Sequence, residues 1–187
     1  MSVRSISSKL AAAVLSLGAV LLASCAETID TAKERRSASE KAFLAYKDST
    51  GYERVSIPGA FEDRYVYMKW TQKATDRSQK PKATDYIRMY YRAAYLLDGI
   101  VFDNNENIAD ASIIPPMAVK RASAGMIDGM AIALQNMAVG DEAIVVVPWY
   151  LAYGESGITR GYQTVVPSYM ALSFSVKLKE IVGDSNE

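Results

Sequence analysis

One short helical segment, set among segments that alternate like strands, is the feature that most restricts the fold of this chain. The stretch SAGMIDGMAIALQNMAVGDEA, residues 123–143, places five apolar residues on one stripe of a helix: Ile127, Met130, Ala131, Leu134 and Met137. Gly140 marks the expected end of this helix. A single short helix cannot enclose a core by itself, so we expect it to pack against a sheet.

Two segments that precede this helix have the character of strands. RYVYMKW, from Arg64 to Trp70, alternates with a period of two residues, and YIRMYYRAAYLL, residues 86–97, is rich in aromatic residues. We expect these segments to be neighbouring antiparallel strands. Asp98-Gly99 predicts a tight hairpin turn after the second one, because glycine accepts the positive φ that such a turn requires.

Two more strands are predicted after the helix. Ala143 to Val147 is a buried strand that Pro148 ends, and the segment YMALSFSVKLKEI turns five alternate residues inward: Met170, Leu172, Phe174, Val176 and Leu178. The order of strands around one helix predicts an α+β domain, in which an antiparallel sheet packs against a single short helix.

The first residues read as a targeting segment. Arg4 and Lys9 precede an uncharged, mostly apolar run from Leu10 to Ser24, which is short for a membrane-spanning helix but typical of a secretory signal peptide. The sequence LLASC ends with Cys25, the only cysteine, and resembles the bacterial lipobox, whose cysteine becomes lipidated. The alternative is an ordinary secreted protein whose cysteine lies near its cleavage site.

The region between Cys25 and the first strand is predicted to link a lipid anchor to the domain. Residues 26–40 are polar and read as a tether, while Ser37 and Glu40 form a capping-box pattern that predicts a short extra helix. We therefore expect a signal peptide over residues 1–24, a lipidated cysteine, tether and short helix over 25–60, and one folded domain over 61–187.

Charge and residue types exclude several classes of function. The 21 basic residues balance the 21 acidic ones, so nothing favours nucleic-acid binding, which needs clustered Lys and Arg. The chain has no histidine, hence no Ser-His-Asp triad and no His-containing metal site. The spacing of its acidic residues does not match a Ca²⁺ loop. We expect neither a metal nor a cofactor.

Four pieces of the chain, in this order and spacing, resemble the FKBP-type peptidyl-prolyl cis-trans isomerases: LLDGIVFD, GMIDGMAIALQNMAVGDEAIVVVP, LAYG and VVPSYMALSFSVKL. The resemblance covers roughly residues 64–182. It implies a twisted antiparallel sheet wrapped around one short helix, with an apolar pocket between them that accepts a proline ring.

The resemblance also implies roles for individual residues. Asp103 would be the acid at the rim of the pocket, Ile127 would offer its backbone N–H to a substrate carbonyl, and Tyr153 would point its hydroxyl into the site. The apolar lining would comprise Phe102, Met117, Met126, Met130, Val165, Val166, Phe174 and, with a one-residue bulge, Tyr91.

Two positions depart from the family pattern. Met130 stands where the family usually has a tryptophan as the pocket floor, and Arg92 stands where its first-strand tyrosine is expected. The implied function is a peptidyl-prolyl isomerase that binds proline-containing polypeptides and assists folding in the bacterial cell envelope, facing the periplasm or in the outer membrane, with a lipid on Cys25 as its contact with the membrane. The alternatives are a catalytically weak or inactive FKBP-like binding lipoprotein and a structural lipoprotein without a ligand.

Overall fold

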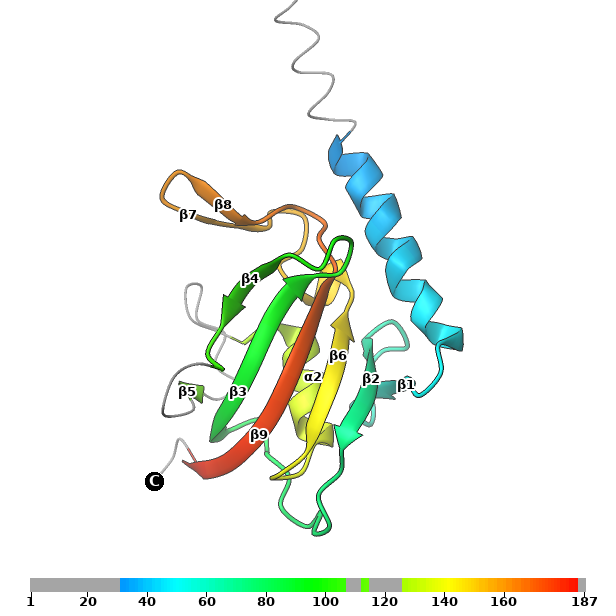
Figure 1. The fold of residues 1–187 in the computed structure, drawn as a ribbon. Coiled ribbons are helices and arrows are strands. Elements are labelled where there is room, and N and C mark those ends of the chain that lie inside the picture. The colour runs from blue at the N-terminus through cyan, green and yellow to red at the C-terminus, as the bar shows by residue number, and fades with distance from the viewer. Residues whose placement is uncertain (1–30, 107–111, 115–125, 185–187) are drawn as a thin grey trace, which may run out of the picture.

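The computed structural model describes residues 31–106, 112–114 and 126–184. The expected signal peptide, Cys25 and Met117 lie outside the described residues. Within the described part, an antiparallel sheet curves around one short helix, α2 (Asp128–Asn136), and a longer helix, residues 31–44, stands beside the sheet (Figure 1). This agrees with the expected α+β class.

The main sheet has the strand order β1-β2-β6-β9-β3-β4, and β5 also pairs with β3. All its pairings are antiparallel. Its strands are β1 (Glu53–Ser56), β2 (Tyr65–Gln72), β3 (Asp85–Tyr95), β4 (Val101–Asn104), β5 (Ser112–Ile114), β6 (Glu142–Val147) and β9 (Leu172–Asp184). A separate hairpin is formed by β7 (Ile158–Arg160) and β8 (Gln163–Val166), and two 3-10 helices are η1 (Ala45–Asp48) and η2 (Trp149–Leu151).

The expectation that the segments around Arg64 and Tyr86 pair with each other was wrong. These segments form β2 and β3, and both β6 and β9 lie between them. The reason is burial: Val145, Val146 and Val147 of β6 have no exposed surface, so consecutive residues are covered on both faces and β6 needs an interior position. The hairpin turn at Asp98-Gly99 is confirmed, with Gly99 at φ 74°.

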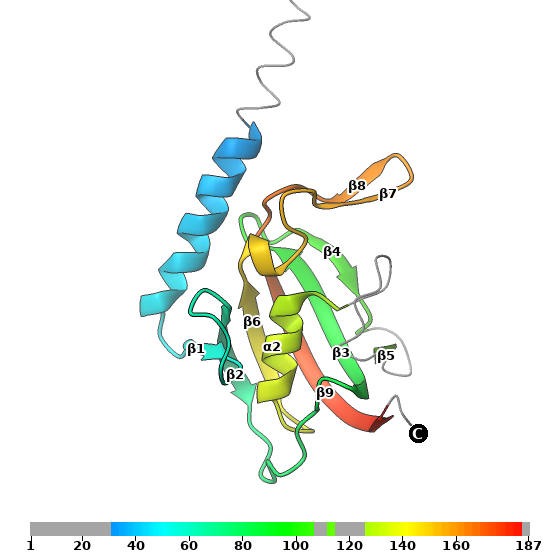
Figure 2. The same ribbon diagram turned by 180° about the vertical axis from the view of Figure 1, so that it is seen from behind.

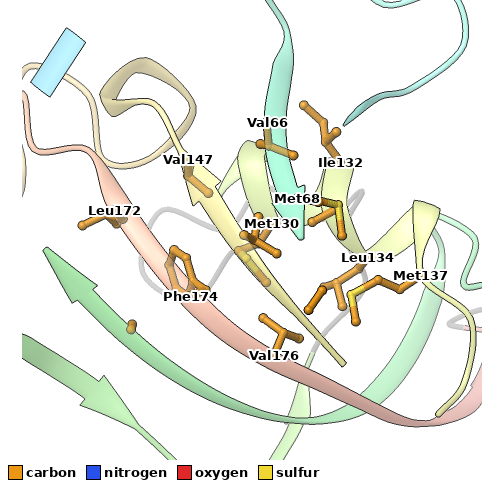
Figure 3. Close-up of a cluster of buried hydrophobic side chains, with 14 of the residues drawn as sticks. Val66, Met68, Met130, Ile132, Leu134, Met137, Val147, Leu172, Phe174 and Val176 are labelled. Carbon is orange, nitrogen blue, oxygen red and sulfur yellow. The ribbon is translucent and has the colours of Figure 1, made fainter. Parts of the chain in front are cut away.

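The main core lies between α2 and the sheet (Figures 2 and 3). All five residues expected to point inward from the last strand are buried. Helix α2 ends at Asn136, four residues before the expected Gly140, because the backbone of Met137 is already extended with φ −87° and ψ 149°. Its buried positions are Gly129, Met130, Ile132, Ala133 and Leu134.

The N-terminal helix corrects two expectations about its region. Residues 31–44 are helical, so the predicted N-cap Ser37 lies inside a helix, and residues 31–40 of the expected tether belong to that helix. Phe43 of this helix packs against Tyr67 of β2 and Val146 of β6, which lie on the face of the sheet opposite to α2. No helix in the described part of the chain is both long enough and apolar enough to span a bilayer.

Candidate functional site

A bulge in β4 lets the consecutive side chains of Phe102 and Asp103 face the same side of the sheet. Ala93 and Ala94 of β3 pair with Asp103 and Val101 of β4, so Phe102 is an extra residue on β4. Consecutive residues of a regular strand point to opposite faces, but a bulge relaxes that rule. Phe102 therefore packs against the main core cluster, while the Asp103 carboxylate also reaches the inner face and accepts a hydrogen bond from Tyr91.

The hydrogen bond between Tyr91 and Asp103 fixes the relative position of β3 and β4 beside the core. The Tyr91 hydroxyl donates to Oδ2 of Asp103 at 3.0 Å. Tyr91 lies on the same face of β3 as the buried residues Met89 and Ala93. The bulge expected at Tyr91 is not in β3, which pairs regularly with β9 from Met89 to Tyr95; the bulge lies in β4 at Phe102, and Arg92 is exposed.

Asn105 and Tyr95 support this hydrogen-bonded pair, and neither was among the expected site residues. The buried amide of Asn105 accepts a hydrogen bond from the Tyr91 N–H at 2.6 Å and donates to the Met89 carbonyl at 2.9 Å. The Tyr95 ring stacks on Phe102, with centroids 5.2 Å apart and planes 15° apart, and its hydroxyl donates to the Val165 carbonyl. Tyr95 thereby joins the sheet to β8. The only hint was its position four residues after Tyr91, on the same strand face.

Two tyrosine hydroxyls at the site stay protonated at neutral pH. Burial, reinforced by the hydrogen bond to Asp103, raises the pKa of Tyr91 to about 12. Burial and the nearby Asp103 charge also raise the pKa of Tyr153, an effect that Arg160 opposes. Arg160 lies on β7 and was not among the expected site residues. Because both hydroxyls keep their protons, each can donate a hydrogen bond.

The N-terminus of α2 forms the opposite side of the site. Ile127 is the residue before the helix, with φ −65° and ψ 145°, and the first backbone N–H groups of a helix have no partner within it. Met126 and Ile127 are half-buried against the core, and Met130 is fully enclosed below them with 2% of its surface exposed. Asp128 anchors this end through an ion pair with Arg64 at 2.6 Å.

The structure gathers the described candidate residues around one apolar cluster. Partly buried at its edge are Tyr91, Phe102, Met126, Ile127, Tyr153 and Val165, and buried within it are Met130, Val166 and Phe174. Among the described residues, no group of acidic, cysteine or histidine side chains could hold a metal ion. Apolar side chains with a few hydrogen-bond donors at their edge are the usual composition of a site for a small apolar ligand.

Comparison with known proteins identifies the family. Residues 77–179 match the model of the FKBP-type peptidyl-prolyl cis-trans isomerase domain. Peptidyl-prolyl cis-trans isomerase FKBP9 of Homo sapiens is 32% identical over 110 residues, which are 59% of this chain and 18% of that protein. The FKBP-type 22 kDa peptidyl-prolyl cis-trans isomerase of Escherichia coli is 34% identical over 102 residues, 54% of this chain and 44% of that protein.

Two crystal structures share the fold. A peptidyl-prolyl cis-trans isomerase of Pseudomonas syringae aligns with a TM-score of 0.62 and 21% identity, over 80% of this chain and 94% of that one. FkpA of Escherichia coli aligns with a TM-score of 0.66 and 18% identity, over 95% of this chain and 74% of that one. The chain spans less than half the length of the two curated relatives, and the family model matches more than half of the chain itself. The chain therefore belongs to the FKBP-type peptidyl-prolyl cis-trans isomerase family.

Proposed function

We propose that this protein is a peptidyl-prolyl cis-trans isomerase that binds X-Pro segments of polypeptides in the apolar site between α2 and the sheet. The observation that carries the proposal is the Tyr91–Asp103 hydrogen bond, at 3.0 Å, beside Phe102 at the edge of the apolar cluster. Apolar side chains alone would fill a purely structural edge without the desolvation cost of a carboxylate and two hydroxyls, so these groups favour a role in binding.

The reaction needs no proton transfer, which fits a chain without histidine. Rotation about the X-Pro bond crosses a barrier of roughly 18–20 kcal/mol because twisting sacrifices amide resonance. An enzyme accelerates it by binding the twisted amide better than either planar form. The twisted amide is less dipolar, so an apolar site disfavours it less than the planar forms.

Two hydrogen-bond donors and an apolar wall would hold the peptide in that geometry. The Ile127 N–H and the Tyr153 hydroxyl would donate to carbonyls on either side of the proline, whose ring would rest among Phe102, Met126 and the neighbouring apolar side chains. Asp103 would position the apolar wall, because its carboxylate accepts a hydrogen bond from the Tyr91 hydroxyl and so fixes the Tyr91 ring. Val165, Val166 and Phe174 complete the lining of the cluster.

The test is the isomerisation of an X-Pro peptide by the whole chain extracted in detergent, followed by exchange NMR. We expect acceleration, with Tyr153→Phe and Asp103→Ala each lowering kcat/KM roughly tenfold. Turnover that both substitutions leave unchanged would contradict the assignment of these residues.

A second candidate function is an FKBP-like module that binds peptides with little catalysis. Met130 favours it: this buried residue replaces the flat tryptophan of the family with a flexible chain, which defines the ring position less sharply. Peptide binding detected by NMR without acceleration of the exchange would establish the binding module instead of the enzyme.

The proposed setting is the bacterial cell envelope, with a lipid on Cys25 holding the domain at a membrane and folding polypeptides as substrates. The lipobox-like LLASC ending of the apolar N-terminal run supports this setting. Metabolic labelling with a radioactive fatty acid tests it, and labelling that persists in Cys25→Ser would refute it.

A further inference from the structure

The loop that carries Tyr153 is closed at its base by backbone hydrogen bonds. The Gly154 N–H donates to the Trp149 carbonyl at 3.0 Å, and the Tyr169 N–H donates to the Gly154 carbonyl at 2.9 Å. The rings of Trp149 and Tyr169 also meet, with centroids 5.0 Å apart. Tyr153 is therefore placed by the two ends of its own loop, one before it at Trp149 and one after it at Tyr169.

The N-terminal helix contacts both of these ends. On the first end, Glu40 Oε1 accepts the Trp149 Nε1–H at 3.2 Å. On the second end, the buried Ser39 Oγ accepts the Ala171 N–H at 3.2 Å, and Arg35 donates to the Ser168 carbonyl at 3.2 Å.

One cation spans the two ends. The guanidinium of Arg36 lies 5.1 Å from the ring centroid of Trp149 and 5.6 Å from that of Tyr169. It is held there by an ion pair with Glu40 at 3.0 Å. A helix far from Tyr153 in the sequence therefore clamps the loop from outside, as Figure 1 shows for its course beside the sheet.

The clamped segment contains a backbone conformation that needs support. Tyr169 has φ 57°, and among the described residues it is the only one other than glycine with a positive φ. Such a conformation is unfavourable for a residue with a Cβ and persists only where the surroundings enforce it. The Tyr169 N–H donates to the Gly154 carbonyl, so a change of Tyr169 to a negative φ would break this hydrogen bond and free the backbone next to Tyr153.

We propose that the N-terminal helix is a positioning element of the isomerase site, in which Ser39 and Glu40 hold the Tyr153 hydroxyl in place through Ala171 and Trp149. The proposal rests on the proposed function, because it deepens the role of Tyr153. Ser39 and Glu40 touch no substrate; they act through the loop.

The test is a double-mutant cycle on the whole chain extracted in detergent. The helix variant carries Ser39→Ala and Glu40→Ala, and the site variant carries Tyr153→Phe. We expect the helix variant to lower kcat/KM for an X-Pro peptide roughly fivefold. Tyr153→Phe should then lower kcat/KM by much less in that background than alone, because the hydroxyl is already displaced. Effects that simply multiply would overturn the proposal.

Matched controls separate positioning from general loss of stability. Glu40→Gln keeps an oxygen acceptor for the Trp149 indole and should retain activity, and Lys41→Ala, at an exposed position of the same helix, should also have no effect. Loss of activity in Lys41→Ala equal to that in the helix variant would contradict the specific role of Ser39 and Glu40.

Amide hydrogen exchange provides a readout that does not depend on catalysis. Exchange at Gly154 and Tyr169 should become at least about tenfold faster in the helix variant, because both amides are donors in the loop base. If the unsubstituted chain fails to isomerise the peptide, the proposed function fails, whereas unchanged exchange at both amides in the helix variant overturns the positioning role itself.

Discussion

At the edge of the apolar cluster, the Tyr91 hydroxyl donates to the Asp103 carboxylate. A polar pair of this kind distinguishes the site from a core made only of apolar side chains. Burial raises the pKa of Tyr91, and the hydrogen bond to Asp103 raises it further, to about 12. Asn105 holds the backbone of the same tyrosine at 2.6 Å. The ring of Tyr91 is thus fixed at its backbone and at its tip.

Substitution of Tyr91 tests whether this pair matters for catalysis. Tyr91→Phe removes the donor at 3.0 Å from Asp103 but keeps the ring, so we expect kcat/KM for an X-Pro peptide to fall about threefold to tenfold. The free energy of unfolding should change by no more than about 1 kcal/mol. Tyr162→Phe is the matched control, because Tyr162 is fully exposed. A loss of activity of the same size in both variants would refute a role for the pair.

The sequence predicted which candidate residues lie together better than it predicted the contacts that hold them. Phe102, Asp103 and Tyr153 were predicted because they stand in family-like motifs, and the structure gathers them beside one cluster. Asn105 and Tyr95 were missed because their roles depend on partners distant in the sequence: Asn105 reaches back to Met89, and Tyr95 reaches Val165, which lies 70 residues away. Local patterns carry no information about such pairs.

Helix α2 is matched to the sheet at a position where no side chain fits. A Cβ on Gly129 would lie 2.3 Å from Cγ1 of Val147, whose side chain is fully buried and stiff at χ1. Alanine is the better helix former by about 1 kcal/mol, so propensity and packing make opposite predictions for this position. Packing should dominate, because interiors are close-packed and Val147 has nowhere to move.

Gly129→Ala should therefore destabilise the protein, by about 1–3 kcal/mol in urea unfolding. Adding Val147→Ala removes the clashing methyl groups. The double variant should therefore lose less free energy of unfolding than the sum of the losses in the two single variants. Additive effects would show that the helix shifts to make room. Gly129→Ala alone with increased stability would show that propensity dominates.

The four longest strands of the main sheet, β2, β3, β6 and β9, were predictable from the sequence, whereas the strand order was not. Alternation identified the inward residues of β9 correctly because they contact the core directly. Alternation in β2 predicts that only one face of the strand is buried, yet Tyr67 and Met68 are both buried, with 4% and 0% exposed, because Phe43 from the N-terminal helix covers Tyr67 with ring centroids 5.0 Å apart. Which strands become neighbours depends on which strands must be covered on both faces. That requirement depends on the complete sheet and cannot be read from one segment.

Asp141 ties distant parts of the whole molecule together. Its carboxylate has no exposed surface and accepts hydrogen bonds from the N–H of Ala74 after β2 at 2.8 Å, from the N–H of Ala138 after α2 at 2.9 Å, and from Arg77 at 2.7 Å. Burial by itself would raise the pKa of Asp141. The hydrogen bonds from Ala138, Ala74 and Arg77 outweigh it and hold this pKa below its ordinary value of 3.8.

Replacing Asp141 should loosen three segments together: the loop after β2, the end of α2 and the start of β6. Asp141→Asn leaves Arg77 without its anion and replaces one of the two oxygens that accept from Ala74 and Ala138 with an NH2 donor, so we expect a loss of about 3 kcal/mol in the free energy of unfolding. Because folding lowers the pKa of Asp141, its charge stabilises the protein above pH 3.8, and this contribution is lost as the pH falls below that value.

Chemical unfolding at several pH values measures both parts of this expectation. The unsubstituted chain should lose stability on acidification below about pH 4, and Asp141→Asn should lose less over the same range because it has no proton to bind there. Glu180→Gln is the control: the ion pair of Glu180 with Arg88 is exposed, so its removal should cost about 0.5 kcal/mol or less. If Glu180→Gln matched Asp141→Asn in both size and pH profile, the buried Asp141 would contribute no more than an exposed ion pair, and the contacts across the fold would have to be stabilised mainly by the apolar core.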